Sequence, residues 1–359
     1  MSINIESPYE ITNRLVKGCR QILKASQVNE KKQVTIFTSR DYPQQHIVNS
    51  YYQASLDLGA ETTIVINEQF KHPILFGPDA IKVPKATEAA IWASDMSIFM
   101  GMDLFRSPIL EKMRKENKAG FFGYNSFRST EKLIINYPPP NESVVKRADA
   151  APKIIKKGSE VKFTTPSGTD LTMVMKSNAS GEIGFLQPNK GHIWDILGGS
   201  GIYGRLEPDS FNGTYIIAPG DYPSELVHRN GFPYAGEKII FKIKENRIIK
   251  IEGGFNAKLQ KEWFDNWDHP NSYLLAHFTI GTHPDMRRDF LRYLNYEIAG
   301  WDGEWIEGLI GFGVGIAPPS HTDFMNRNGS IYVDGEKILD NEKFVGPLSD
   351  EALGIKHKK

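Results

Sequence analysis

The chain has 359 residues, of which 40% are hydrophobic and 24% charged, with 43 basic and 43 acidic residues. This composition is typical of a folded globular protein and excludes a disordered, collagen-like or coiled-coil chain. Because the formal net charge is zero and no apolar run approaches the ~18 residues that span a bilayer, we expect neither nucleic acid nor membrane as a partner.

The amino terminus and the cysteine content indicate a reducing compartment. The first residues are partly acidic, where a secretion signal would have an apolar core. Cys19 is the only cysteine, which excludes an intrachain disulfide and a zinc or iron–sulfur site built from cysteines. We therefore expect a cytoplasmic protein.

Residues 1–150 alternate strand-like and helix-like segments, which predicts an α/β domain with a parallel sheet and crossover helices. No G-x-G-x-x-G motif follows the first strand, so nothing indicates a dinucleotide site and we expect a scaffold domain. The expected strands are 33–39, 61–66, 97–100 and 120–124, and the expected helices are 44–58 and 108–118.

Residues 137–152 are rich in proline and charge, and we expect the domain boundary or a hinge there. Beyond it, strands with turn signals predict a second, mixed α+β domain over residues 151–359, rich in antiparallel sheet. The expected hairpins are 161–175, 238–251 and 330–339, and the expected helices are 257–267 and 285–294.

His321 and Asp323 stand two residues apart, after the glycine-rich residues 311–319. In an extended segment both side chains point to the same face. They then have the geometry of two neighbouring ligands in a 2-His-1-carboxylate metal site. A hydrogen-bonded structural pair is the alternative, because His-x-Asp is a common sequence.

A third ligand has to come from elsewhere in the chain, and His277 lies in the apolar, strand-like run 273–284. A lone histidine on an apolar strand is more often a hydrogen-bonded core residue than a ligand. His269 and His283, each next to a proline, are competing candidates.

Several short motifs, in their order and spacing, resemble the ring-opening 2,5-dihydroxypyridine dioxygenases and, more distantly, the thermophilic-type metalloaminopeptidases that share their fold. The motifs are Gly213 and Thr214, residues 219–221, residues 249–255, His277 with Ile280 and Gly281, residues 319–324 and residues 331–338. The resemblance implies an Fe(II) ion held by His277, His321 and Asp323. It also implies O2 and a hydroxylated pyridine or related aromatic ring as substrates, and assembly as a homo-oligomer.

The resemblance also distinguishes the dioxygenases from the aminopeptidases. The aminopeptidases have a glutamate at the position of His277 and a further carboxylate where this chain has the glycines and serine of residues 198–201. Two-metal hydrolysis needs bridging carboxylates. The resemblance therefore favours the dioxygenase branch.

Two positions depart from the dioxygenases, which have histidines where this chain has Arg106 and Ile196. Arginine is no base near neutral pH but pairs well with anions, so we expect Arg106 to bind an anionic ring substrate. A surface or interdomain salt bridge is the alternative for Arg106. Phe105 and Trp194, with Phe185, are the expected aromatic walls, unless they belong to the core.

For handling substrate protons, the resemblance implies Glu182, which aligns with a glutamate of the family, and Asp195 as a second candidate. The alternative for both is a helix cap or a surface carboxylate.

Three functions remain open from the sequence: an Fe(II) ring-cleaving dioxygenase, a Zn²⁺ or Mn²⁺ metallohydrolase of the aminopeptidase type, and a non-catalytic binding protein in which the three side chains only hydrogen-bond one another. Oxygen uptake during turnover separates the first two, and metal analysis separates the third.

Overall fold

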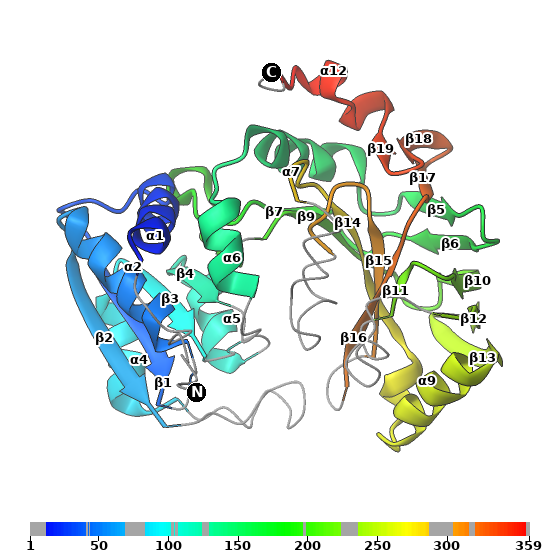
Figure 1. Cartoon of the computed structure of the whole chain (residues 1–359), viewed down its shortest axis with the longest axis horizontal. Helices are drawn as coiled ribbons and strands as arrows, with labels where there is room; N and C mark the ends of the chain where they lie inside the picture. The colour runs from blue at the N-terminus through cyan, green and yellow to red at the C-terminus, as the bar shows by residue number, and fades with distance from the viewer. Residues whose placement is uncertain are drawn as a thin grey trace, which may run out of the picture. The chain divides into compact units, whose positions relative to one another are not determined.

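The computed structural model describes residues 12–40, 42, 44–68, 83–101, 104, 107–123, 129–196, 199–223, 236–286, 304–315 and 320–356 (Figure 1). The chain folds into two compact units. The first comprises Met1–Pro140 and Gly184–Gly199, and the second comprises Asn141–Ile183 and Ser200–Lys359. The chain therefore leaves the first unit, returns to it for one short segment and leaves it again.

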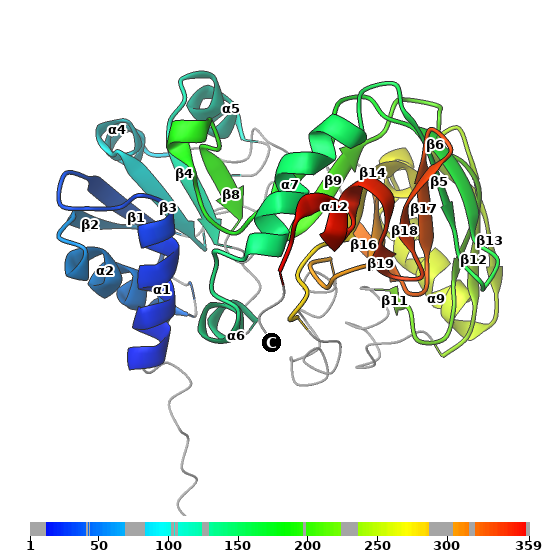
Figure 2. The same ribbon diagram turned by 90° about the horizontal axis from the view of Figure 1, so that it is seen from above.

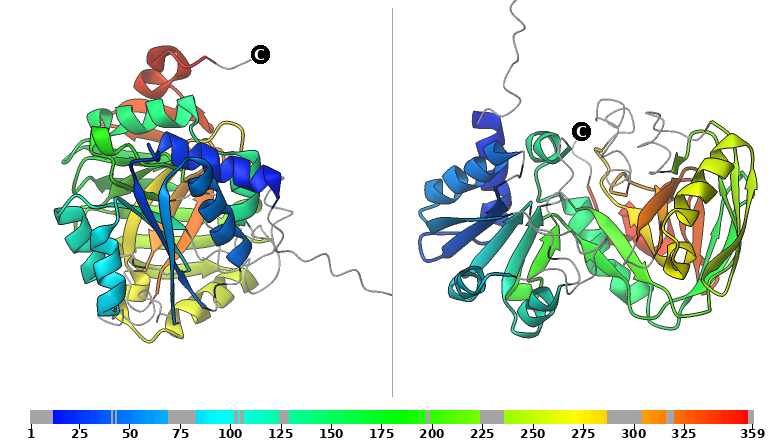
Figure 3. Two further views of the ribbon diagram at one scale, coloured as in Figure 1. Left: turned by 90° about the vertical axis from the view of Figure 1, so that its left-hand side faces the viewer. Right: turned by 90° about the horizontal axis from the view of Figure 1, so that it is seen from below.

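The first unit is a parallel sheet between two layers of helices (Figures 2 and 3). Its strand order is β2-β1-β3-β4-β8, and every neighbouring pair is parallel, which confirms the α/β prediction. The strands are β1 (Gln33–Ser39), β2 (Glu61–Asn67), β3 (Met96–Met100), β4 (Ala119–Gly123) and β8 (Trp194–Ile196). Helices α1 (Asn13–Ala25), α2 (Gln45–Asp57) and α6 (Ser129–Asn136) lie on one face, and α4 (Lys85–Ala93) and α5 (Pro108–Lys115) on the other.

The second unit contains two antiparallel sheets, as the hairpin-rich sequence predicts. The larger sheet has the order β13-β12-β10-β6-β5-β17-β18-β19, and the smaller has the order β11-β16-β15-β14-β9-β7. The strands of the larger sheet are β5 (Glu160–Thr164), β6 (Asp170–Val174), β10 (Asn212–Ile217), β12 (Ile239–Lys244), β13 (Arg247–Gly253), β17 (Ser330–Val333), β18 (Glu336–Asp340) and β19 (Lys343–Phe344). Those of the smaller are β7 (Ser180–Glu182), β9 (Gly201–Arg205), β11 (Tyr222–Pro223), β14 (Leu275–Gly281), β15 (Ile310–Val314) and β16 (Thr322–Asn326).

Aromatic side chains from both sheets form the core between them. The Phe163 and Phe312 ring centroids lie 5.4 Å apart, and those of Phe241 and Phe324 lie 5.3 Å apart. All four rings are buried, and rings at such separations add to the hydrophobic stabilisation of the core. The α-helices of the second unit are α7 (Glu142–Ile154), α9 (Phe255–Asp265) and α12 (Asp350–Leu353). Short 3-10 helices cover Pro270–Tyr273 and Gly346–Leu348 in the same unit. Another covers Pro188–Lys190 in the first unit.

The turns explain why the predicted hairpins form. Glu245 and Asn246 have φ values of 52° and 59°, and Asp334 and Gly335 have φ values of 50° and 86°. Two successive left-handed residues are the conformation of a tight type I′ hairpin turn, which asparagine, aspartate and glycine favour.

Most predicted element ends agree with the structure to within two residues, and three segments need comment. Helix α5 ends at Lys115 rather than at residue 118, because Asn117 adopts a left-handed conformation with φ 55°. The two units divide between Pro140 and Asn141, inside the segment 137–152 where a boundary or hinge is expected. Residues 142–152 of that segment are helical, since Asn141 caps α7 by accepting from the backbone N–H groups of Ser143 and Val144. The helix expected at 285–294 does not start at Asp285, which lies in a turn, and residues 287–294 are outside the described residues.

Within the described part of the chain, none of the helices has the length and apolar character needed to cross a membrane.

Candidate metal centre

The six-stranded sheet has one apolar face and one face that carries polar side chains and glycine. Phe278, Ile280, Phe312 and Phe324 point into the core. Cross-strand partners share a face of a sheet, so the residues that alternate with these four point to the opposite face. That face bears His277 on β14, Gly313 on β15 and Asp323 on β16, which are aligned in one row across the three strands.

A β-bulge in β14 lets Leu275 and His277 point to opposite faces of the sheet. Leu275 pairs with Val314 and His277 pairs with Gly313, so Ala276 is an extra residue on β14. Without the bulge, Leu275 and His277 would share a face, since side chains alternate with a period of two. The extra residue reverses the alternation, so Leu275 is buried in the core while His277 points away from it.

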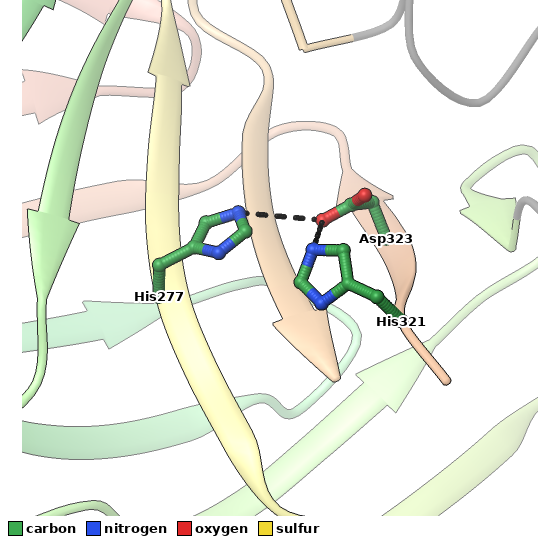
Figure 4. Close-up of side chains that lie close together, drawn as sticks. All are labelled: His277, His321 and Asp323. Atoms are coloured by element: carbon green, nitrogen blue, oxygen red, sulfur yellow. Dashed lines mark ion pairs between the residues drawn. The ribbon is translucent and has the colours of Figure 1, made fainter. Parts of the chain in front are cut away.

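His321 directly precedes β16 and Asp323 is the second residue of that strand, and their side chains converge with that of His277 (Figure 4). The candidate ligand atoms of the three residues all lie within 4.8 Å of one another. Asp323 Oδ1 lies 3.4 Å from His277 Nε2 and 3.7 Å from His321 Nε2. We call these three residues the triad.

Gly313 makes room for the triad. A Cβ atom at this position would lie 2.3 Å from Cε1 of His277 and 2.8 Å from Cε1 of His321. Both distances are far below van der Waals contact, so the two imidazole rings occupy the space over the glycine. Within the glycine-rich run of the sequence, Gly313 is therefore a point where the backbone comes close to the triad.

The second ring nitrogen of His321 fixes its tautomer. Nδ1 lies 2.8 Å from the carbonyl oxygen of Gly315, which can only accept a hydrogen bond. Nδ1 therefore carries a proton in the neutral ring, and the lone pair of Nε2 faces Asp323. Metal-binding histidines typically have this arrangement.

Glu304 is a fourth ionisable group at the triad, and the sequence motifs did not indicate it. Its side chain is buried, and its Oε1 lies 4.0 Å from His277 Nε2. Its Oε2 accepts a hydrogen bond of 3.4 Å from the Tyr203 hydroxyl, which in turn accepts one of 3.3 Å from the Trp305 indole. The only feature of the sequence that points to Glu304 is its place in an acidic stretch between Trp301 and Trp305.

The electrostatics of this cluster favour positive charge. Burial lowers the pKa of His277, but the contacts with Asp323 and Glu304 outweigh burial and raise that pKa to about 9. Burial and the charge of Asp323 raise the pKa of Glu304. Burial raises the pKa of Asp323, but the positive charge of His321 and the contact with His277 outweigh it and lower that pKa. A divalent cation would supply the same positive charge.

The donor set fits a single redox-active ion. Two imidazoles and one carboxylate on one side of an ion are the ligands of non-haem Fe(II) oxygenases. The competing histidines lie elsewhere: His283 Nδ1 accepts a hydrogen bond from the backbone of Asp285, and His269 Nδ1 accepts one from the backbone of Asn271. Among the described residues, the triad is the one group of three or more such side chains with this geometry.

The other candidate residues are distributed over both units. Glu182 lies in β7 of the same sheet, and pairing through Gly201 and Gly281 places it on the face that carries His277.

Asp195 and Trp194 belong to β8 of the first unit. Asp195 Oδ2 lies 2.5 Å from His192 Nε2, and the Trp194 ring lies under the Arg114 guanidinium at 4.5 Å. Phe105 and Arg106 lie outside the described residues, and Phe185 is a core residue.

Comparison with known proteins identifies relatives along nearly the whole chain. Residues 14–346 match the family model described as 2,5-dihydroxypyridine 5,6-dioxygenase. A curated protein of that name from Pseudomonas putida KT2440 is 24% identical, with 94% of this chain and 98% of that protein covered.

Two solved structures have the same fold. The structure of 2,5-dihydroxypyridine dioxygenase from Pseudomonas putida KT2440 superposes with a TM-score of 0.78 at 22% identity, covering 94% of this chain and 98% of that one. Wild-type AmpT from Thermus thermophilus superposes with a TM-score of 0.59 at 11% identity, covering 94% of this chain and 100% of that one.

Proposed function

Because the chain belongs to the 2,5-dihydroxypyridine 5,6-dioxygenase family and is thus a ring-cleaving dioxygenase, an oxidoreductase, we propose that it binds one Fe(II) ion through His277, His321 and Asp323. We propose that it uses O2 to open a hydroxylated pyridine or a related electron-rich ring. The observation that carries the proposal is the convergence of two imidazoles and one carboxylate over Gly313.

The residues at the proposed metal site have distinct parts in this proposal. Iron, when bound, supplies the redox chemistry that couples oxidation of the ring to reduction of O2. The hydrogen bond to Gly315 orients His321 so that Nε2 can be a ligand. Asp323 balances part of the charge of the cation, and Gly313 leaves the space over β15 to the two imidazole rings.

We propose Glu182 and Asp195 for the transfer of substrate protons. The position of Glu182 on the His277 face of the sheet supports the first assignment. The short contact of Asp195 with His192 supports the second assignment, because it holds that imidazole in one orientation. Substrate binding by Phe105, Arg106 and Trp194 also remains a proposal, with an anionic ring as the substrate that Arg106 favours.

A metallohydrolase is the second candidate, because the AmpT structure shares the fold. The match to the dioxygenase family argues against it. Two-metal hydrolysis needs carboxylates that bridge cations ~3.5–4 Å apart, and the triad supplies one carboxylate, Asp323, with Glu304 as the further buried carboxylate beside it. Hydrolysis consumes no O2, so the two candidates differ in one direct measurement.

The test is anaerobic reconstitution of the purified protein with Fe(II), followed by O2 consumption with a panel of hydroxylated pyridines and aromatic acids. We expect one iron per chain and ring-dependent O2 uptake that is lost in His321→Ala and Asp323→Asn. His269→Ala is the matched control, because that histidine lies outside the triad. Turnover without O2, or a protein that retains activity without iron, would contradict the proposal.

We also propose a cytoplasmic homo-oligomer. Its single, buried cysteine supports a reducing compartment, and the resemblance to the family supports assembly. Light scattering coupled to size-exclusion chromatography measures the mass directly, and a monomer would contradict this part.

A further inference from the structure

Residues 304–307, which we call the strap, connect the triad to a buried arginine. The strap lies against the end of β14 through backbone contacts. The His283 N–H donates to the Trp305 carbonyl at 3.0 Å, and the Glu307 N–H donates to the His283 carbonyl at 3.2 Å. A Cβ atom at Gly281 would lie 1.9 Å from the Ile306 carbonyl oxygen, so the strap rests directly on the glycine.

The first residue of the strap reaches the triad. Glu304 lies beside His277 and is also held by the Tyr203 hydroxyl. Its Oε1 faces Nε2 of His277, the nitrogen that also faces Asp323, so its carboxylate adds negative charge beside the ligand atoms. Loss of a group next to the metal ligands typically lowers metal affinity about 10- to 100-fold. The position of Glu304 therefore matters for any cation that the triad holds.

The last residue of the strap is held by helix α7. Glu307 Oε1 lies 2.8 Å from the Arg147 guanidinium, whose second contact is Asp350 Oδ1 at 2.5 Å. The Arg147 side chain is 1% exposed, and its guanidinium also lies 4.2 Å from the centre of the Phe344 ring. A buried cation is tolerated only when it is paired, so the two carboxylates and the arginine constrain one another strongly.

We propose that Arg147 is a positioning residue of the metal centre: by binding Glu307 it fixes the strap, and through the strap it fixes Glu304 beside His277. The inference rests on the proposed metal site. The two partners of Arg147 differ in this respect, because Glu307 belongs to the strap whereas Asp350 belongs to α12. Removal of either partner weakens the ion-pair cluster, but only removal of Glu307 takes a side-chain anchor from the strap, which then keeps its backbone contacts with His283.

The experiment measures the affinity of the metal-free full-length protein for Co(II) by its absorption spectrum, which requires no turnover. Glu304→Gln should weaken Co(II) binding by about 10-fold or more. Glu307→Ala should weaken it in the same direction, while Asp350→Ala, the matched control, should bind Co(II) like the wild type. The double variant Glu304→Gln/Glu307→Ala should bind no more weakly than Glu304→Gln alone, because both changes act through one group.

Thermal unfolding of each variant separates positioning from general stability. We expect Glu307→Ala and Asp350→Ala to lower Tm by similar amounts, so stability alone would affect Co(II) binding equally in both. Normal Co(II) affinity in Glu307→Ala or in Glu304→Gln, or equal loss in Asp350→Ala, would overturn the inference. A wild-type protein that takes up no Co(II) would instead overturn the metal site itself, which is a different result.

Discussion

Gly313 is the residue whose lack of a side chain decides whether the triad can form. Its backbone is extended and demands no glycine, so the requirement for glycine comes only from the two imidazoles that lie over it. Gly236, by contrast, has open space around it: a Cβ atom there would meet its nearest neighbour, Asn256 Nδ2, at an ordinary 3.7 Å.

We predict that Gly313→Ala displaces His277 and His321 and lowers kcat/KM by about 100-fold, because a shift of ~1 Å in a catalytic group has an effect of that order. Iron content and O2 uptake measure the effect, and circular dichroism checks the fold. Gly236→Ala should leave both quantities unchanged. Full activity in Gly313→Ala would show that the rings do not need this space.

His283 leads to a prediction about how the free energy of unfolding depends on pH. Burial lowers its pKa to about 4, whereas an unfolded chain has a histidine pKa of about 6.5. The unfolded state therefore binds the additional proton first, and stability falls as the pH drops from about 6.5 to about 4, with no contribution above this window.

Between pH 7 and pH 5, His283 should account for a loss of about 2 kcal/mol in the free energy of unfolding. Urea unfolding at the two pH values measures it. His283→Asn retains an acceptor for the Asp285 N–H but has no titratable group, so its stability should change less over this interval. Identical pH dependence in both proteins would contradict the assignment.

At the scale of elements, helix α7 begins where the sequence pattern indicates a boundary. Pro138, Pro139 and Pro140 precede the helix, and Asn141 accepts hydrogen bonds from the N–H groups of Ser143 and Val144 at 3.0 and 3.3 Å. A side-chain acceptor at this position satisfies amide groups that have no partner within the helix.

We predict that Asn141→Ala lowers the free energy of unfolding by about 1 kcal/mol, since this is the usual cost of a lost amino-terminal cap. Asn141→Asp keeps the acceptor and should stay close to the wild type. Urea unfolding of the three proteins tests the prediction, and equal stability of the alanine and aspartate variants would exclude a capping contribution.

At the scale of the whole molecule, all three residues of the triad belong to the second unit, although their positions in the chain span 277–323. Metal binding should therefore stabilise the second unit selectively, because a ligand lowers the free energy only of the state that binds it. At a free metal concentration of 100 times Kd, the stabilisation is about 2.7 kcal/mol.

We predict that removal of the metal by a chelator accelerates hydrogen exchange in β14, β15 and β16, while the amides of β1 and β3 keep their exchange rates. Exchange followed by mass spectrometry measures both regions in one sample. His321→Ala, which lacks a ligand, should show no response to the chelator. A uniform change over both units would contradict selective stabilisation.

The sequence by itself determined much of this architecture, because the deciding interactions are local. Alternating apolar residues, and Glu245-Asn246 and Asp334-Gly335 at the turns, indicated the hairpins. Likewise, His321 and Asp323 share a face because strand geometry requires it. Two features remained hidden: β8, which pairs with β4 although more than 70 residues separate them, and Glu304, which reaches His277. Only the tertiary structure decided these, because strand order, the bulge at Ala276 and the path of the strap depend on contacts between segments far apart in the chain.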